Sequence, residues 1–288
     1  MATKKKVLTD QDYEELNKMM AEYEAAPNSC KIEFYHDDGS LWYQGMRGGY
    51  GGRDYVRHRL VFPANPFSVK LESEAISRFK EIARNATISD ELYDAFNKEI
   101  EQITFEDGTY GEDDAEQVAA LNFFLTYELY NYEDIDDTIV ELCPDTLDVL
   151  KDVALITPIV YDQYVVTTMD IMSESLWNLN KYEETEKWLL AALDICRQDM
   201  LRFSLVDWKF RTINHYWLIG KLYQEWDKPN KAIAYCEEGW RTFTASETPV
   251  AKFVVHGIAD SLCQLYEQCG MSDKLQKFRA EIEEYSLE

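Results

Sequence analysis

The chain has 288 residues and a mass of 33.7 kDa, of which 46% are hydrophobic and 14% aromatic, enough for about two domains with real cores. This composition excludes collagen-like, low-complexity and wholly disordered chains. The 29 basic and 54 acidic residues give a formal charge of −25, which repels nucleic-acid phosphates and anionic membranes. We therefore expect no direct nucleic-acid or membrane binding by the surface as a whole.

Nothing in the sequence predicts a membrane span, a secretory leader or a disulfide framework. No apolar stretch approaches the roughly 18 residues of a span, and the basic start Met1 to Lys6 precedes a polar run, Thr9-Asp10-Gln11-Asp12. The six cysteines are scattered without a Cys-x-x-Cys pair, which is typical of reduced, buried thiols. We expect a soluble cytoplasmic protein without a metal or other cofactor.

Residues 1–70 predict a small α+β module. Thr9 is a suitable cap for a helix from about Asp10 to Ala26, which Pro27 ends. Extended segments follow at residues 31–36, 41–43 and 55–62, separated by turn-forming residues. Together they predict an antiparallel sheet of two or three strands.

A glycine-rich loop with two arginines lies inside this module. Its residues are Arg47, Gly48, Gly49, Gly51, Gly52 and Arg53. Consecutive glycines free the backbone to turn its N–H groups toward an anion, and the arginines would complete such a nest. The spacing fits neither the dinucleotide-binding nor the phosphate-loop motif. We favour the alternative, a hairpin tip whose arginines pair with the protein's own carboxylates.

Residues 71–156 predict an acidic helical region. Apolar residues recur at helical spacing at Ala75, Ile76, Phe79 and Ile82 and continue in this way through Tyr127. Residues 115–156 are compatible with a degenerate helical hairpin whose turn is Asn131-Tyr132-Glu133-Asp134.

The charge is concentrated in this region, since residues 85–152 hold 20 acidic and only two basic residues, a balance of −18. That equals the charge on about 30 Å of duplex DNA. The densest parts are Glu106, Asp107, Glu112, Asp113, Asp114, Glu116, Glu133, Asp134, Asp136 and Asp137. Three interpretations stay open: a nucleic-acid mimic, a docking face for a basic protein, and a solvated acidic surface that keeps the chain soluble. The spacing of these acids does not match a calcium loop.

The last 130 residues contain a repeat. Three segments align, Met169–Cys196, Tyr216–Phe243 and Ala259–Ile282, and each has two amphipathic stripes around a turn at Asn180, Asp227 or Gly270. The prolines Pro158, Pro229 and Pro249 each fit a helix start. Paired helices in tandem are therefore expected from residue 157 to 288.

These segments resemble the tetratricopeptide repeat. The residues that carry the resemblance are Tyr216, Ile219, Gly220, Tyr223, Ala232 and Gly239, then Met172, Leu176, Tyr182, Leu189 and Ala192, then Leu262, Tyr266, Leu275 and Ile282. The turns are 47 and 43 residues apart rather than 34, the closing proline is absent, and Thr185 and Leu275 stand where alanine is usual. The resemblance implies a divergent superhelix with a concave face lined by the first helix of each pair.

In that family the concave face holds peptides. The positions that match it here are Asp170, Glu174, Trp177, Asn178, Asn214, Trp217, Lys221, Gln224, Asp260, Gln264 and Glu267. Lys221 is the sole basic member, which puts the family's clamp for a terminal carboxylate in doubt and favours a ligand with Lys or Arg. The alternative is that Trp177 and Trp217 are ordinary core residues.

The motifs of common enzymes are missing, and we expect no catalysis. The four histidines lie far apart in the sequence, although His215 and His256 occupy comparable places in neighbouring repeats. We expect a mainly α protein, an α+β module followed by a helical repeat array, that acts as a protein- or peptide-binding adaptor or regulator with a basic partner. The alternatives are an acidic inhibitor that blocks another protein's nucleic-acid site, and a small-molecule or phosphate sensor. Self-association through the aromatic helices is left open.

Overall fold

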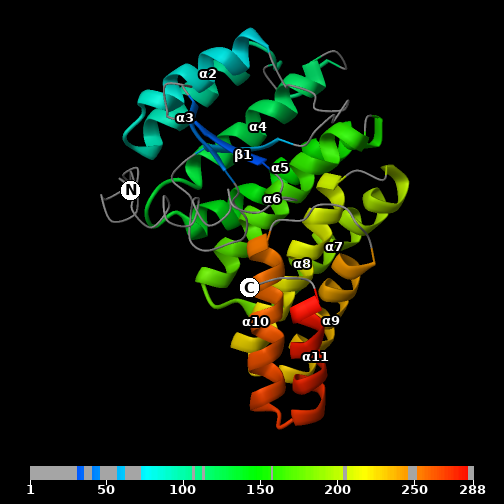
Figure 1. Cartoon of the computed structure of the whole chain (residues 1–288). Coiled ribbons are helices and arrows are strands. Elements are labelled where there is room, and N and C mark those ends of the chain that lie inside the picture. The colour runs from blue at the N-terminus through cyan, green and yellow to red at the C-terminus, as the bar shows by residue number, and fades with distance from the viewer. Residues whose placement is uncertain are drawn as a thin grey trace. The chain divides into compact units, whose positions relative to one another are not determined.

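A computed structural model of the chain describes residues 31–35, 41–45, 57–61, 73–105, 108–111, 114–156, 158–203, 206–245 and 252–284. The first three ranges are strands, and the rest are helices with their turns (Figure 1). Within the part of the chain so described, no helix has both the length and the apolar character of a membrane span.

The strands β1 (Lys31–Tyr35) and β3 (Arg57–Val61) lie within the extended segments expected at 31–36 and 55–62, and β2 (Leu41–Gly45) continues two residues beyond the segment expected at 41–43. They pair antiparallel in the order β2-β1-β3, with β1 in the centre. The helix expected at residues 10–26 and the glycine-rich loop from Arg47 to Arg53 lie outside the described residues. The α+β module as a whole therefore stays a prediction.

The helices follow from residue 74 to 284. Their bounds are α2 (Glu74–Asn85), α3 (Ser89–Ile100), α4 (Ala115–Leu129), α5 (Asp136–Ile156), α6 (Pro158–Asn178), α7 (Tyr182–Phe203), α8 (Val206–Glu225), α9 (Pro229–Thr244), α10 (Lys252–Gln268) and α11 (Ser272–Glu284). Pro158 and Pro229 begin α6 and α9, as the sequence predicts, whereas Pro249 lies outside the described residues. The mainly α class is confirmed for this part of the chain.

The helices divide into two compact units at Ala192 and Leu193, inside α7. In the first unit α2 packs on α3 and α4, and α4 packs on α5, which packs on α6. In the second, α8 packs on α9, and α10 packs on α8, α9 and α11. The domain boundary expected at residues 156 and 157 falls between α5 and α6, which lie side by side within the first unit.

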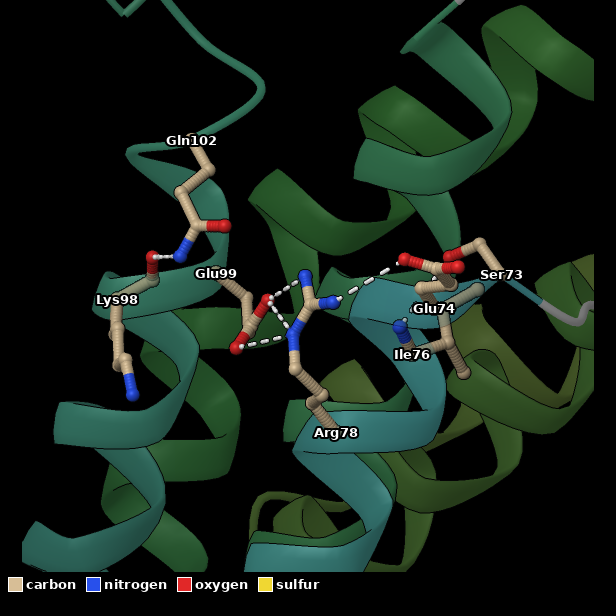
Figure 2. Close-up of polar contacts among 7 residues, drawn as sticks. All are labelled: Ser73, Glu74, Ile76, Arg78, Lys98, Glu99 and Gln102. Carbon is tan, nitrogen blue, oxygen red and sulfur yellow. Dashed lines mark hydrogen bonds and ion pairs between the residues drawn. The ribbon is translucent and has the colours of Figure 1, made fainter.

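A helix cap and the ion pair of Arg78 with Glu99 stabilise the start of the helical part. The Ser73 hydroxyl accepts a hydrogen bond from the Ile76 amide, 3.2 Å away, at the N-terminus of α2. Farther along α2, the guanidinium of Arg78 holds both carboxylate oxygens of Glu99 on α3, at 2.7–3.1 Å (Figure 2). Because Glu99 is buried, its carboxylate has lost its contacts with water, and the ion pair with Arg78 offsets that loss. The pair also joins α2 to α3.

One turn recurs at the end of α6, α8 and α10. Asn180, Asp227 and Gly270 take the left-handed conformation, with φ of 58°, 53° and 66°. In each turn the next amide donates to a carbonyl five residues earlier: Lys181 to Leu176, Lys228 to Tyr223, and Met271 to Tyr266, at 2.8–2.9 Å. This is the Schellman arrangement, and the next helix begins two residues after the left-handed residue. The three turns expected from the sequence are confirmed.

The packing within and between these hairpins uses small and aromatic residues. A Cβ at Gly220 would lie 2.4 Å from Cys236 Sγ, so α8 approaches α9 as closely as the expected small residues imply. Tyr266 on α10 donates a hydrogen bond to Glu237 on α9, 2.7 Å away, and so fills the space between two hairpins.

Residues 115–156 also form a hairpin, because α4 packs on α5 and Asp134 has φ of 48°. Ile82 departs from the pattern: it is exposed, and Ala83 takes its place in the core.

Candidate functional site

One face of α8 brings three of the expected binding residues together. Asn214, Trp217 and Lys221 follow one another at intervals of three and four residues, so they lie on one side of the helix. Trp217 reaches across to α10, where its indole lies against Gly257 and its Nε1 donates to Ser261 Oγ at 3.4 Å. The face is therefore shared by the first helices of two neighbouring hairpins.

Asn214 is the polar residue at the bottom of this face. It is 93% buried, with 7% of its surface exposed, and its Oδ1 has no hydrogen-bond partner in the described part of the chain. A buried acceptor left without a donor costs about 1–3 kcal/mol. The oxygen itself has less than 1 Å² of accessible surface, so a ligand N–H group would remove this cost once the amide turns its oxygen toward the surface.

The indole of Trp217 is half-buried and carries a cation of its own. The ammonium of Lys221 lies 5.2 Å from the centre of the ring. One turn further along α8, Gln224 is half-buried. On α10, Asp260, Gln264 and Glu267 are exposed at helical spacing from Gly257. The face thus has an amide and an aromatic ring inside and carboxylates at its edge.

The remaining expected residues lie on α6, in the first unit, and are described separately from α8 and α10. Asp170, Glu174 and Trp177 are half-buried. Asn178 is exposed, and its Nδ2 lies 3.3 Å from both carboxylate oxygens of Asp136 at the start of α5. Asn178 thus has a local structural role, because it joins the end of α6 to the start of α5.

The acidic face expected from the sequence is only partly described. Glu106, Asp107, Glu112 and Asp113 lie outside the described residues. Glu116, Glu133, Asp134 and Asp137 are exposed, whereas Asp114 and Asp136 are half-buried.

A more regular acidic surface lies along α5. The exposed residues Asp137, Glu141, Asp145, Asp148 and Asp152 follow at intervals of four, four, three and four residues. That spacing places them on one side of the helix, and we call them the α5 stripe. Runs of neighbouring acids in the sequence point to Asp137 but miss the other four residues. The helical period within residues 137–152 is the signal that identifies them.

His215, Cys143 and Cys236 are reactive groups that lie buried in the described residues. His215 Nδ1 lies 2.7 Å from the carbonyl oxygen of Arg211 and 3.8 Å from Cys196 Sγ, which is the environment of a packing histidine. Burial raises the pKa of the Cys143 and Cys236 thiols to about 12. No three His, Cys, Asp or Glu side chains gather as metal ligands in the part of the chain that is described.

No protein-family model and no curated protein sequence matches the chain. The structure is similar to that of apo RapI, with a TM-score of 0.53 at 14% identity; the match covers 72% of this chain and about half, 51%, of RapI. It is also similar to a kinesin light chain with TPR-like repeats from Podosopora anserina (TM-score 0.48, 11% identity, 73% of this chain, 92% of that one). A third similar structure is BtubC from P. vanneervenii (TM-score 0.47, 14% identity, 68% and 74%). At such identities the likeness concerns the fold alone, and at that level the expected resemblance to TPR-like helical repeats is confirmed.

Proposed function

We propose that this chain is a non-catalytic adaptor or regulator that binds an extended, basic peptide segment of a partner protein on the face of α8 and α10. The observation that carries the proposal is the buried, unpaired Oδ1 of Asn214 beside the half-buried indole of Trp217. An extended peptide has unpaired backbone N–H groups at regular intervals, and one of them would donate to this oxygen.

The charge of the molecule supports a basic partner. Asp260 and Glu267 stand exposed on α10 beside the proposed site, and the whole chain carries −25. Opposite charges on a ligand raise the rate of encounter and disfavour acidic competitors. Lys and Arg side chains in the ligand therefore fit the edge of the site, and its backbone fits Asn214.

A nucleic-acid mimic is the alternative function, and the α5 stripe is the observation that tests it. Its five carboxylates extend over 16 residues of helix, from Asp137 to Asp152, or about 22 Å. Duplex DNA carries a charge about every 1.7 Å, which is more than twice as dense. The stripe therefore suits a basic protein surface better than a site shaped for duplex. The phosphate sensor depends on the glycine-rich loop, which lies outside the described residues.

A peptide selection tests the proposed function. We expect the full chain to select peptides rich in Lys and Arg from a displayed library of random twelve-residue sequences. The Asn214→Leu variant is expected to bind the selected peptides about tenfold more weakly, because it lacks the acceptor. Its urea unfolding midpoint should stay the same or rise, because a buried unpaired amide has been replaced by an apolar group of similar size.

Gln276→Ala, an exposed change on α11, is the matched control and should bind like the native chain. The proposal is wrong if selection yields no peptide, or if Asn214→Leu and Gln276→Ala bind the peptides equally well.

A further inference from the structure

The half-buried ring of Trp217 is held by contacts from both helices of the site. A Cβ on Gly257 would lie 2.4 Å from Cζ2 and 2.5 Å from Cε2 of the indole, closer than any ordinary contact. Gly257 lies within α10, where glycine is less favourable than alanine and where no positive φ requires it. Its role is therefore to admit the ring.

The ring also holds an ammonium group that has no ion pair in the described residues. Lys221 Nζ lies 5.2 Å from the ring centre, and Lys221 forms no salt bridge within the described ranges. Carboxylates are plentiful on this protein, yet this cation rests on an aromatic ring. The environment of Trp217 is thus one that stabilises a cation.

We propose that the ring of Trp217 is a binding subsite for a Lys or Arg side chain of the ligand, that Lys221 occupies it in the free protein, and that Gly257 positions the ring. This inference rests on the proposed function and specifies its ligand. The guanidinium or ammonium of the ligand replaces that of Lys221, while the ligand backbone donates to Asn214 one turn away.

Trp217 differs from two other tryptophans that carry a lysine. Lys228 lies over Trp226, and Lys187 lies over Trp188. Neither of those tryptophans lies on a first-helix face beside a buried, unpaired acceptor. Trp226 and Lys228 therefore serve as an internal control for simple cation–ring contact.

The test uses the full chain with ¹⁵N-labelled tryptophan and Nα-acetyl-arginine amide as the probe. The indole N–H signal of Trp217, assigned with Trp217→Phe, should shift and saturate, while Nα-acetyl-norleucine amide leaves it unchanged. The Lys221→Met variant removes the internal competitor and keeps the length of the side chain. It should bind the probe about threefold more tightly, whereas Lys228→Met should not change the affinity at Trp217.

The Gly257→Ala variant tests the positioning residue. The added Cβ displaces the ring, so the saturable shift of the Trp217 signal should disappear, while the helix remains folded because alanine favours it. An unchanged affinity in Gly257→Ala, a weaker affinity in Lys221→Met, or no shift by the arginine probe would each overturn the inference. If Asn214-dependent peptides bind without these effects, only the subsite is wrong; if the probe binds but no peptide is selected, the proposed function is wrong.

Discussion

Glycines within the C-terminal helices serve close approaches between helices. Gly220 faces Cys236, and Gly257 faces Trp217, with no room for a Cβ in either place. Gly270 differs, because it lies in a turn with φ of 66° and has open space around its Cα. At its equivalents in the other hairpins, Asn180 and Asp227 adopt the same conformation. A glycine is therefore needed inside the helices and only preferred in the turn.

The contact at Gly220 gives a prediction at the scale of one residue. Gly220→Ala should lower the free energy of unfolding by about 1–3 kcal/mol, because the new Cβ would lie 2.4 Å from Cys236 Sγ and force α8 and α9 apart. Adding Cys236→Ala makes room and should restore part of the loss. Urea denaturation measures both variants. Gly111→Ala, whose Cβ meets only Asp114 Oδ2 at 3.4 Å, is the control. A Gly220→Ala variant as stable as the native chain would show that the helices separate without cost.

At the scale of elements, polar contacts join successive hairpins. Glu237 on α9 receives hydrogen bonds from Tyr266 on α10 and Lys274 on α11, each at 2.7 Å. Beside them, Trp240 Nε1 donates to Glu281 at 2.7 Å, and Phe278 packs edge-on against both Trp240 and Tyr266. Aromatic rings supply the buried area of this junction, and the carboxylates orient the rings.

The Glu237 junction gives a prediction about pH. Partial burial raises the pKa of Glu237, but the hydrogen bonds from Lys274 and Tyr266 outweigh it and lower the pKa below its ordinary 4.5. The ionised form is thus the one that stabilises the fold. Lys274→Met should cost about 0.5–1 kcal/mol of unfolding free energy at pH 7. The difference should shrink as the pH falls below 4.5, where Glu237 becomes protonated.

Urea unfolding of both proteins between pH 3 and pH 7 measures this difference. Lys277→Met, an exposed change on the same helix, is the control and should show no such trend. A cost of Lys274→Met that stays constant over the whole range would contradict the assigned role of Glu237.

At the scale of the whole molecule, the dominant property is the negative charge. Of the formal −25, residues 85–152 contribute −18, and the α5 stripe presents part of it in an ordered, exposed row. Such a field acts over about a Debye length, 8 Å at physiological salt, and speeds the encounter with a basic ligand more than it strengthens the final complex.

Neutralising the α5 stripe tests this role. A variant with Asp137, Asp145, Asp148 and Asp152 changed to Asn and Glu141 changed to Gln should bind poly-L-lysine, a basic probe that any acidic surface can attract, with a slower association rate and a flatter salt dependence. Stopped-flow kinetics at several salt concentrations measures these rates. The control neutralises five exposed acids elsewhere: Glu183, Glu184, Asp194, Glu225 and Glu283. Equal slowing in both variants would assign the effect to net charge rather than to the stripe.

The amino-acid sequence by itself determines the repeat and its turns, because both are encoded locally. A left-handed turn residue selects Asn, Asp or Gly, and the stripe of apolar residues on each side defines a helix whatever it packs against. The turns at Asn180, Asp227 and Gly270 and the small residues Gly220 and Ala232 at close helix contacts therefore follow from local pattern. The candidate residues on α8 are likewise identified from their positions in the repeat.

The tertiary structure decides which residues meet. The sequence does not tell that Trp217 rests on Gly257, 40 residues away, that Asn178 is bound to Asp136, or that Ile82 stays exposed. These facts depend on the distance and angle at which two helices cross. Many side chains of both helices determine that crossing jointly, and each of them contributes only a little. The spacing of apolar residues along one helix shows which face is buried, but not which other helix packs against that face.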